Sequence, residues 1–416
     1  MMQLPKYSMG VGDRFAHEGG AQLDAVLQAQ REGVEIAPVW NKSHREHTIV
    51  GSRPADVRAE ADRAVAARHW KLPYFVDADH ISLKTVDGFL EASDFFTLDV
   101  ADWIGRDAGD AAIEAFVGRH ESLIGSLTIA GIERPVTISR PMIVEAARKF
   151  LAAIHEAGEI HRRIEAVKGD RAVIEVSLDE TDRPQTPLEL LMILSMVSEE
   201  NIPAQTIAPR FAGRFNKGVE YVGDPAEFGR QFHDDLAVVA FAVERFALPK
   251  NLKLSVHSGS DKFAIYGPMR EAMRQFGAGV HLKTAGTTWL EELIGLAAAG
   301  DEGLQIAKDV YRGAFGRFDE LCAPYATVID IERAKLPAPD VVDRWNGETF
   351  AAALRHDASC PTYDPNVRQL LHVGYKVAAE MGRRFTDALE QHAKVVGDHV
   401  TQNLYERHIR PLFLGK

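Results

Sequence analysis

The sequence contains few cysteines, no long apolar run and no excess of basic residues. Cys322 and Cys360 are the only cysteines among 416 residues, too few for a disulfide framework or a cysteine-based zinc site. The longest apolar stretches, such as residues 190–194 and 238–243, fall far short of the roughly 20 residues that span a bilayer. The N-terminus has no apolar segment typical of a signal peptide. We therefore expect a cytoplasmic protein without a membrane partner.

The charge balance excludes a further class of partner. Forty-eight basic and 60 acidic side chains give a net charge of −12, whereas binding to nucleic acid requires a basic surface. A small basic pocket for one anion is compatible with this balance. The apolar content of 46% and charged content of 26% are typical of a folded globular chain.

Motifs for nucleotide binding or serine-based catalysis are missing. The segment MGVGDRF at residues 9–15 has two glycines beside an Asp-Arg pair, but it lacks the third glycine of a dinucleotide-binding fingerprint. Neither a P-loop nor a G-x-S-x-G nucleophile motif occurs. The sequence therefore gives little support for a nucleotide cofactor.

Short apolar runs alternate with helix-start signals in the middle of the chain. Runs at residues 172–178, 203–207, 252–256 and 280–282 each lead to a polar cluster and then to a helix start, near Thr186, Asp224, Gly267 and Thr288 respectively. Segments 74–79 and 95–98 resemble earlier strands of the same kind. Repeated βα units predict the α/β class, with a (β/α)8 TIM-barrel-like fold and additional C-terminal helices. An open doubly wound sheet is the alternative.

A change of pattern near residues 334–343 predicts the domain organisation. We expect a barrel-type catalytic domain at 1–333 and a helical segment at 334–416 that packs on it, with a single domain 1–416 as the alternative. Amphipathic helices are predicted at 367–387 and 385–404. These helices could pack on the barrel or on a neighbouring chain in a homo-oligomer.

Histidines and carboxylates gather after the predicted strands, where ligands bind in both architectures. His80, His257 and His281 have the composition of a divalent metal site for Zn, Fe, Co or Ni, or for Mn if carboxylates contribute more. The alternative for each is a hydrogen-bonded core histidine. In a regular strand His80 would face away from Asp77 and Asp79, so it points inward only where the strand has ended.

Other charged residues after the strands allow two readings each. Close carboxylates at Asp77 and Asp79 would raise one pKa, which suits a general base, but they could also simply close a loop. The acidic cluster at residues 179–182 could belong to the site, or its negative charge could complement the N-terminus of the helix that follows. Lys283 could form a Schiff base or anchor a carboxylate. Arg210, Arg214 and Lys217 could hold an acidic substrate or form an ordinary surface loop.

Six segments in the same order resemble the tagaturonate epimerase family: SMGVGDRFAHEGGAQL, PYFVDADHISL, DETDRPQTPLELL, VHSGSDKF, HLKTAGTTWLE and DPNVRQLLHVGYKVAAEMG. The resemblance extends from about residue 7 to the C-terminal helices. It implies a barrel fold, a divalent metal, and epimerisation at the carbon β to the ketone of tagaturonate and fructuronate. A β C–H is not acidified by the ketone, so the implied route is retro-aldol cleavage, rotation of the aldehyde fragment and re-addition to its other face.

The resemblance also implies roles for individual residues. His80, His257 and His281 would bind the metal, and Asp79 and Glu180 would accept and donate the proton, in an order that is not fixed. Substrate hydroxyls or the carboxylate would be bound by Lys262, Lys283, Arg14, Arg210 and Lys217. His372 and Lys376 would close the site from the C-terminal segment, or else serve helix packing.

Other functions remain open at this stage. A metal-dependent aldolase or isomerase of a related sugar acid or ketohexose would use the same residues. A sugar-acid-binding protein without turnover is the alternative from a different class. All of these have a small-molecule sugar acid or sugar as the partner.

Overall fold

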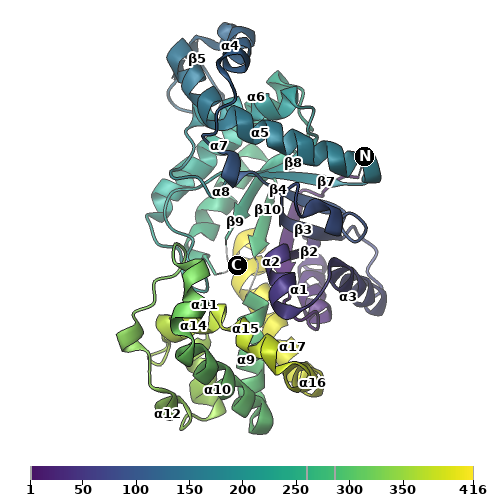
Figure 1. Cartoon of the computed structure of the whole chain (residues 1–416), viewed down its shortest axis with the longest axis vertical. Helices are drawn as coiled ribbons and strands as arrows, with labels where there is room; N and C mark the ends of the chain where they lie inside the picture. Colours follow the sequence, from purple (N-terminus) through teal and green to yellow (C-terminus); the bar gives the residue numbers. More distant parts are fainter. Residues whose placement is uncertain (1, 259–260, 285–286, 416) are drawn as a thin grey trace.

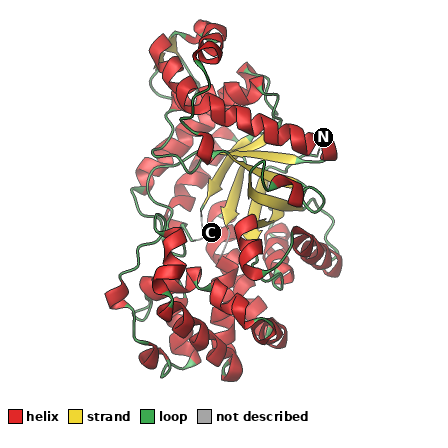
Figure 2. Cartoon of the chain, in the orientation of Figure 1, coloured by secondary structure: helices red, strands yellow, loops and turns green. Residues whose placement is uncertain are grey.

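Eight parallel strands close into a barrel at the centre of the molecule (Figure 2). The computed structural model describes residues 2–258, 261–284 and 287–415. The strands are β1 (Tyr7–Gly12), β2 (Ala37–Ser43), β3 (Phe75–Ile81), β4 (Phe95–Asp99), β7 (Val173–Ser177), β8 (Ala204–Ala208), β9 (Lys253–His257) and β10 (Val280–Thr284). Their order around the barrel is β1-β10-β9-β8-β7-β4-β3-β2. The barrel prediction is confirmed, and the open-sheet alternative is wrong.

Six of the eight strands coincide with segments predicted from the sequence. β1 and β2 were not predicted. β1 reads YSMGVG and β2 reads APVWNKS, so glycine, proline and polar residues interrupt the apolar, β-branched pattern that identifies buried strands. Both are held in place by parallel pairing, β1 with β10 and β2 with β3.

Helices surround the barrel and alternate with its strands (Figure 1). They are α1 (Gly19–Arg31), α2 (His44–Val50), α3 (Pro54–Ala67), α4 (Asp110–Arg119), α5 (Arg140–Lys168), α6 (Pro187–Glu199), α7 (Pro225–Arg245), α8 (Tyr266–Phe276) and α9 (Thr287–Ala299). Thr186 and Glu189 form the expected capping box of α6, and Asp224 caps α7. α8 and α9 begin one residue before the predicted starts at Gly267 and Thr288.

Between β4 and β7 the chain leaves the barrel. This excursion contains α4 and a two-stranded antiparallel sheet of β5 (Gly125–Leu127) and β6 (Val136–Ile138), which project at the top of Figure 1. Single 3-10 turns lie at Val86–Gly88, Ala101–Trp103, Glu121–Leu123, Phe263–Ile265, Ala323–Tyr325 and Arg333–Lys335.

The C-terminal third is helical and gathers below the barrel in Figure 1. Its helices are α10 (Asp301–Gly316), α11 (Phe318–Cys322), α12 (Pro339–Val342), α13 (Gly347–Leu354), α14 (Pro365–Val373), α15 (Tyr375–Met381), α16 (Arg383–Gln391), α17 (Ala393–Gln402) and a π-helix (Asn403–Leu414). Two long helices at 367–387 and 385–404 are therefore a wrong prediction. The chain breaks at Gly374, Gly382 and His392, and Gly382 has a φ of 56°, which glycine adopts readily.

Apolar side chains from the barrel helices and the C-terminal helices share one core. Leu23 of α1, Leu293 of α9 and Val396 of α17 belong to the same buried cluster, and α17 packs directly against α1 and α9. The division near residue 333 stays a prediction. Among the helices of the described residues, none has the length and apolarity required to cross a membrane.

Candidate metal and sugar-acid site

Polar side chains fill the carboxyl-terminal half of the barrel interior, while an apolar layer closes the other end. Leu4, Val39, Phe75, Phe95 and Val173 form that apolar layer. Two residues further along β3 and β7, the same inward face carries Asp77 and Glu175. The barrel therefore presents a polar floor to its carboxyl end, where barrel enzymes bind substrates.

A β-bulge in β3 turns His80 toward the interior. Ala78 pairs with Phe96 of β4 but Ile81 pairs with Leu98, so β3 contains one extra residue between them. His80 has a φ of 52°, a conformation that is uncommon for residues other than glycine. The bulge breaks the alternation that would have turned His80 away from Asp79.

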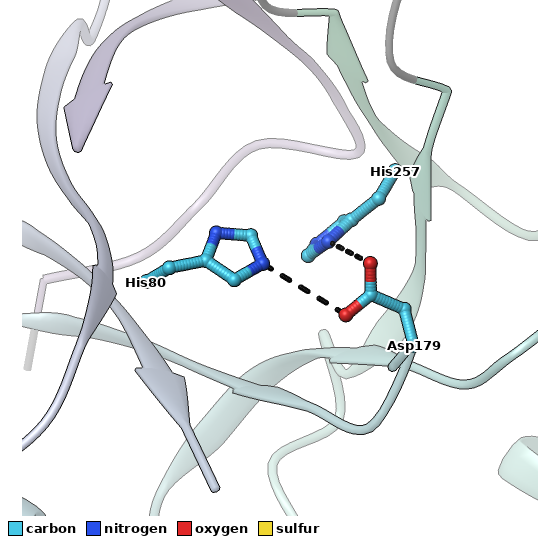
Figure 3. Close-up of side chains that lie close together, drawn as sticks. All are labelled: His80, Asp179 and His257. Carbon is cyan, nitrogen blue, oxygen red and sulfur yellow. Dashed lines mark hydrogen bonds and ion pairs between the residues drawn. The ribbon is translucent and has the colours of Figure 1, made fainter. Parts of the chain in front are cut away.

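His80, Asp179 and His257 converge at the barrel mouth (Figure 3). One ligand atom from each lies within 4.8 Å of the others. His257 Nδ1 is 3.0 Å from Asp179 Oδ2, and His80 Nε2 is 3.8 Å from Asp179 Oδ1. Two imidazoles and one carboxylate form a donor set suited to a first-row divalent metal.

A second carboxylate orients each of the two imidazoles. Asp79 Oδ1 is 2.7 Å from His80 Nδ1, and Glu175 Oε1 is 2.8 Å from His257 Nε2. The remaining nitrogens, His80 Nε2 and His257 Nδ1, face Asp179. Carboxylates of this kind fix the tautomer and raise the basicity of metal-binding histidines, so the residues present fit a divalent metal.

The electrostatics of the group agree with a site for positive charge. Burial alone would lower the pKa of His80, but the carboxylate of Asp79 and hydrogen bonds raise it well above its ordinary value. Burial opposes ionisation of Asp179, yet His257 and His80 hold the pKa of that carboxyl well below its usual range. The carboxylates therefore favour cationic imidazoles here, and a bound cation would take the place of those protons.

His281, predicted as the third histidine ligand, does not join this group. Its register partner on β9 is Ser255, whereas the partner of Lys283 is His257, so His281 lies one layer deeper in the barrel. Its Nδ1 is 2.9 Å from Ser8 Oγ, and burial lowers its pKa to about 3. Asp179 stands where the third histidine was expected.

Lys283 is surrounded by carboxylates and has no freedom to reach a substrate. Its Nζ lies 2.9 Å from Asp77, 2.7 Å from Asp79 and 3.5 Å from Glu175, and it donates to Thr97 Oγ1 at 2.5 Å. Burial opposes its charge, but these carboxylates raise its pKa above the ordinary value. A Schiff-base role is therefore not supported, because a permanently protonated amine is not a nucleophile. Burial raises the pKa of Asp77 to about 6.

Three other predicted basic residues are occupied by the protein itself. Lys262 Nζ donates to the backbone carbonyls of Asn216, Val219 and Asp261, so its role is to hold the loop after β8. Arg210 donates to the backbone carbonyl of Asp179, which fixes the loop that carries this carboxylate. Lys376 pairs with Glu320 on the surface.

Arg14, Lys217 and His372 form a basic cluster at the mouth. His372, on α14, is buried beside Gly218, and neither of its ring nitrogens has a partner in the described parts of the chain. Burial lowers its pKa well below the usual value, and the charges of Arg14 and Lys217 contribute. Lys217 Nζ has no hydrogen-bond or ion-pair partner among the described residues. The cluster is therefore electropositive and incompletely satisfied.

Arg14 links the basic cluster to the barrel. Its guanidinium lies 3.4 Å from Glu46 and stacks 4.4 Å over the ring of Tyr375, while its Nε has no partner among residues 2–258, 261–284 and 287–415. Asp13 accepts hydrogen bonds from the backbone N–H groups of residues 15–18. These bonds fix the loop after β1 and so position Arg14.

Glu180 lies at the solvent-exposed rim beside Asp179. Loss of surrounding water and the carboxylates of Asp179 and Asp99 raise its pKa. It has no ion-pair partner within the described parts of the chain. It therefore differs from Asp79, which is buried and paired with Lys283.

Sequence reasoning did not place Asp179 with the two histidines, and it did not single out Glu175. Asp179 was noted only as part of an acidic cluster. Glu175 lies inside a strand between Ile174 and Val176, and this alternation with apolar neighbours was the one available signal. The pairs at 259–260 and 285–286, within two of the motifs that carry the family resemblance, lie outside the described residues.

Known proteins share both the sequence pattern and the fold. A sequence model described as tagaturonate epimerase matches residues 1–410. The tagaturonate/fructuronate epimerase of Thermotoga maritima is 25% identical, over 97% of this chain and 80% of its own length. Two crystal structures of the fructuronate-tagaturonate epimerase of Cohnella laeviribosi are each 22% identical. The native form has a TM-score of 0.81, covering 99% of this chain and 82% of that one. The form with one glycerol has a TM-score of 0.77, covering 97% and 81%.

The structural similarity at 22% identity shows the common fold. Family membership is shown by the match to the sequence model. Because that match extends over nearly the entire sequence, the chain belongs to the tagaturonate epimerase family, whose members are isomerases.

Proposed function

We propose that this protein interconverts tagaturonate and fructuronate with the help of a divalent metal. The observation that carries the proposal is the presence of two unlike groups at one barrel mouth. His80, Asp179 and His257 suit a metal that binds sugar oxygens. The basic cluster of Arg14, Lys217 and His372 suits a carboxylate. A ketohexuronate carries its ketone and its carboxylate at separate positions and would use both groups.

The metal would be held by His80 Nε2, His257 Nδ1 and Asp179, with His281 no longer among the proposed ligands. When bound, it would supply Lewis-acid stabilisation of negative charge on the ketone oxygen. Asp79 and Glu175 would hold the imidazoles in the required orientation. The identity of the metal among Zn, Mn, Fe, Co and Ni is a matter for experiment.

Inversion at the carbon β to the ketone requires proton transfer on two faces of that carbon. In the retro-aldol direction the β-hydroxyl loses its proton, its C–O bond becomes a carbonyl, and the α–β carbon bond breaks, leaving its electron pair on the enediolate. We assign proton acceptance to Asp79, which its ion pair with Lys283 keeps ionised. Proton donation on the other face is assigned to Glu180, which has no cationic partner among the described residues.

The test is direct. Purified protein is treated with EDTA, incubated with fructuronate or tagaturonate, and then supplied with Mn²⁺, Zn²⁺, Co²⁺, Ni²⁺ or Fe²⁺ while products are followed by NMR. Metal-restored interconversion is the expected result. Accumulating three-carbon fragments would indicate an aldolase, and the absence of any change with all five metals would overturn the proposal.

A further inference from the structure

Asn41 is buried in the barrel with an unsatisfied side-chain amide. It is 3% exposed, and neither Oδ1 nor Nδ2 has a hydrogen-bond partner among the residues that the structure describes. Buried amides are almost always hydrogen-bonded, because leaving both atoms unpaired forfeits their interactions with water. Asn41 therefore has unused hydrogen-bonding capacity in the folded chain.

Strand register shows that Asn41 faces the interior. Val39, two positions earlier on β2, packs with Phe75 in the apolar layer of the barrel, and alternate residues share a face. The register partner of Asn41 on β3 is Asp77, which contacts Lys283 across the barrel. Asn41 thus belongs to the same polar floor as Asp77.

The neighbouring strand β1 places glycines, and no other side chains, beside this amide. On β1 the inward positions begin with Ser8, which contacts His281, and continue with Gly10 and Gly12. Gly12 is the register partner of Asn41. Because glycine has no side chain, neither Gly10 nor Gly12 can offer Asn41 a side-chain hydrogen bond.

The order of strands places Asn41 between Arg14 of the basic cluster and the β3 residues Asp79 and His80. Arg14 follows β1, Asn41 lies on β2, and Asp79 lies on β3, and these strands are neighbours. In a ketohexuronate the hydroxyl next to the carboxylate lies between the carboxylate and the reacting carbon. An amide both donates and accepts hydrogen bonds, as does a hydroxyl.

We propose that Asn41 binds this hydroxyl, the one next to the substrate carboxylate. The inference rests on the proposed function and adds a specificity residue to it. Retro-aldol cleavage would leave a three-carbon fragment, a 2-hydroxy-3-oxo acid, in the site. With its carboxylate bound by the basic cluster and its hydroxyl bound by Asn41, only the aldehyde group is free to rotate about the bond that attaches it. Asn41 therefore retains the three-carbon fragment in the site while the other face of its aldehyde group turns toward the enediolate for re-addition.

The experiment measures both rate and product partition in Asn41→Ala. We expect kcat/KM for the hexuronates to fall about 10- to 100-fold, the effect of losing a buried hydrogen-bonding partner of a substrate hydroxyl. Released three-carbon aldehyde, trapped and quantified by NMR, should rise relative to epimer. Metal content and thermal unfolding should match those of the parent protein. Ser93→Ala is the control, because Ser93 Oγ is also buried and unpartnered but precedes β4, at the opposite end of the barrel.

A substrate analogue that lacks this hydroxyl provides a second measurement. The parent protein should discriminate against it by the same factor that Asn41→Ala loses, and Asn41→Ala should not discriminate further. Parent-level kcat/KM and partition in Asn41→Ala would overturn the inference and leave the proposed function intact. If Asn41→Ala fails to fold, equal kcat/KM of the parent protein for the substrate and the analogue would overturn it. A parent protein that interconverts neither acid with any metal would instead overturn the proposed function, and this inference with it.

Discussion

The two sides of the barrel mouth differ in how completely the folded chain satisfies their polar groups. On the metal side, Asp79, Glu175 and Asp179 are paired with Lys283 or with the two imidazoles. Glu175 Oε2 is the one oxygen of these three carboxylates that is buried without a partner in the described chain, whereas on the basic side both ring nitrogens of His372 and the Nε of Arg14 lack one there. The first side is a preorganised network that fixes geometry. The second has donors left for a ligand, and it requires α14 from the C-terminal segment in addition to the barrel.

The largest effects should come from the metal side. His257→Ala and Asp179→Ala should lose bound metal and lower kcat/KM by at least about 1,000-fold, since Lewis-acid stabilisation contributes several kcal/mol. His281→Gln should keep its metal, because His281 contacts Ser8 and lies one layer deeper. Metal content after dialysis, measured by mass spectrometry, checks this. A metal-free His281→Gln would show that the donor set is wrongly assigned.

Lys283→Met tests whether the paired network also stabilises the fold. Removing the ammonium leaves Asp77, Asp79 and Glu175 without their shared cation in a buried environment. We expect the free energy of unfolding in urea to fall by about 3–5 kcal/mol. Lys376→Met is the matched control, because Lys376 pairs with Glu320 at the surface, where such pairs contribute roughly 0–1 kcal/mol. Equal losses in the two variants would contradict the comparison.

Lys217→Met probes the incompletely satisfied side. Because no partner in the described chain uses Lys217 Nζ, its loss should leave stability within about 0.5 kcal/mol of the parent. The KM for the hexuronates should rise about 10-fold or more, as expected for a charge-assisted hydrogen bond to the carboxylate. The KM for a neutral ketohexose, which has no carboxylate, should rise much less. Steady-state kinetics with both substrate types decide the matter, and an equal loss for both would argue against carboxylate binding.

The smallest predicted effect on activity concerns the buried carboxylate of Glu18, which lies away from the mouth and has no side-chain partner among the described residues. Glu18 lines a cavity of about 500 Å³ between α1, α3 and α17, and burial raises its pKa from 4.5 to about 8. The folded state therefore holds this proton more tightly, so its stabilising contribution is full below pH 4.5 and is lost as the pH rises through 8.

Glu18→Gln should remove this pH dependence. Relative to the parent, the variant should gain up to about 4 kcal/mol of unfolding free energy between pH 5 and pH 8.5, at about 1.4 kcal/mol per pH unit between the two pKa values, with kcat/KM unchanged. Urea titrations at the two pH values measure the difference. Altered kcat/KM would mean that an unpaired group outside the mouth also contributes to the reaction.

The sequence predicted the barrel because β3, β4 and β7–β10 have the short apolar pattern of buried strands. It did not predict β1 or β2, whose inward residues near the mouth are glycine and asparagine. The rule that ligands bind at strand ends grouped His80, Asp79 and His257 in one candidate site, and the structure brings these side chains close together. The rule could not give the depth of a side chain along the barrel axis, so His281 was grouped with residues one layer above it.

The sequence also could not show which groups each charged side chain contacts in the folded chain. Lys283 and Lys262 have the same chemistry as Lys217, and only the fold shows that carboxylates surround the first and backbone carbonyls the second. Asn41 and His372 stand out for the opposite reason, since the fold leaves both unsatisfied. Such a difference depends on contacts between residues far apart in the chain.

The bulge at His80 restricts which amino acids this position can accept, independently of any ligand. At a φ of 52°, β-branched side chains are strained, whereas asparagine, aspartate, histidine and glycine adopt this conformation more readily. Of these four, only histidine offers an imidazole. Alanine at position 80 would therefore combine backbone strain with loss of the imidazole, and His80→Asn is the cleaner probe of ligand chemistry. The backbone thus disfavours β-branched side chains at position 80 whether or not a ligand is bound.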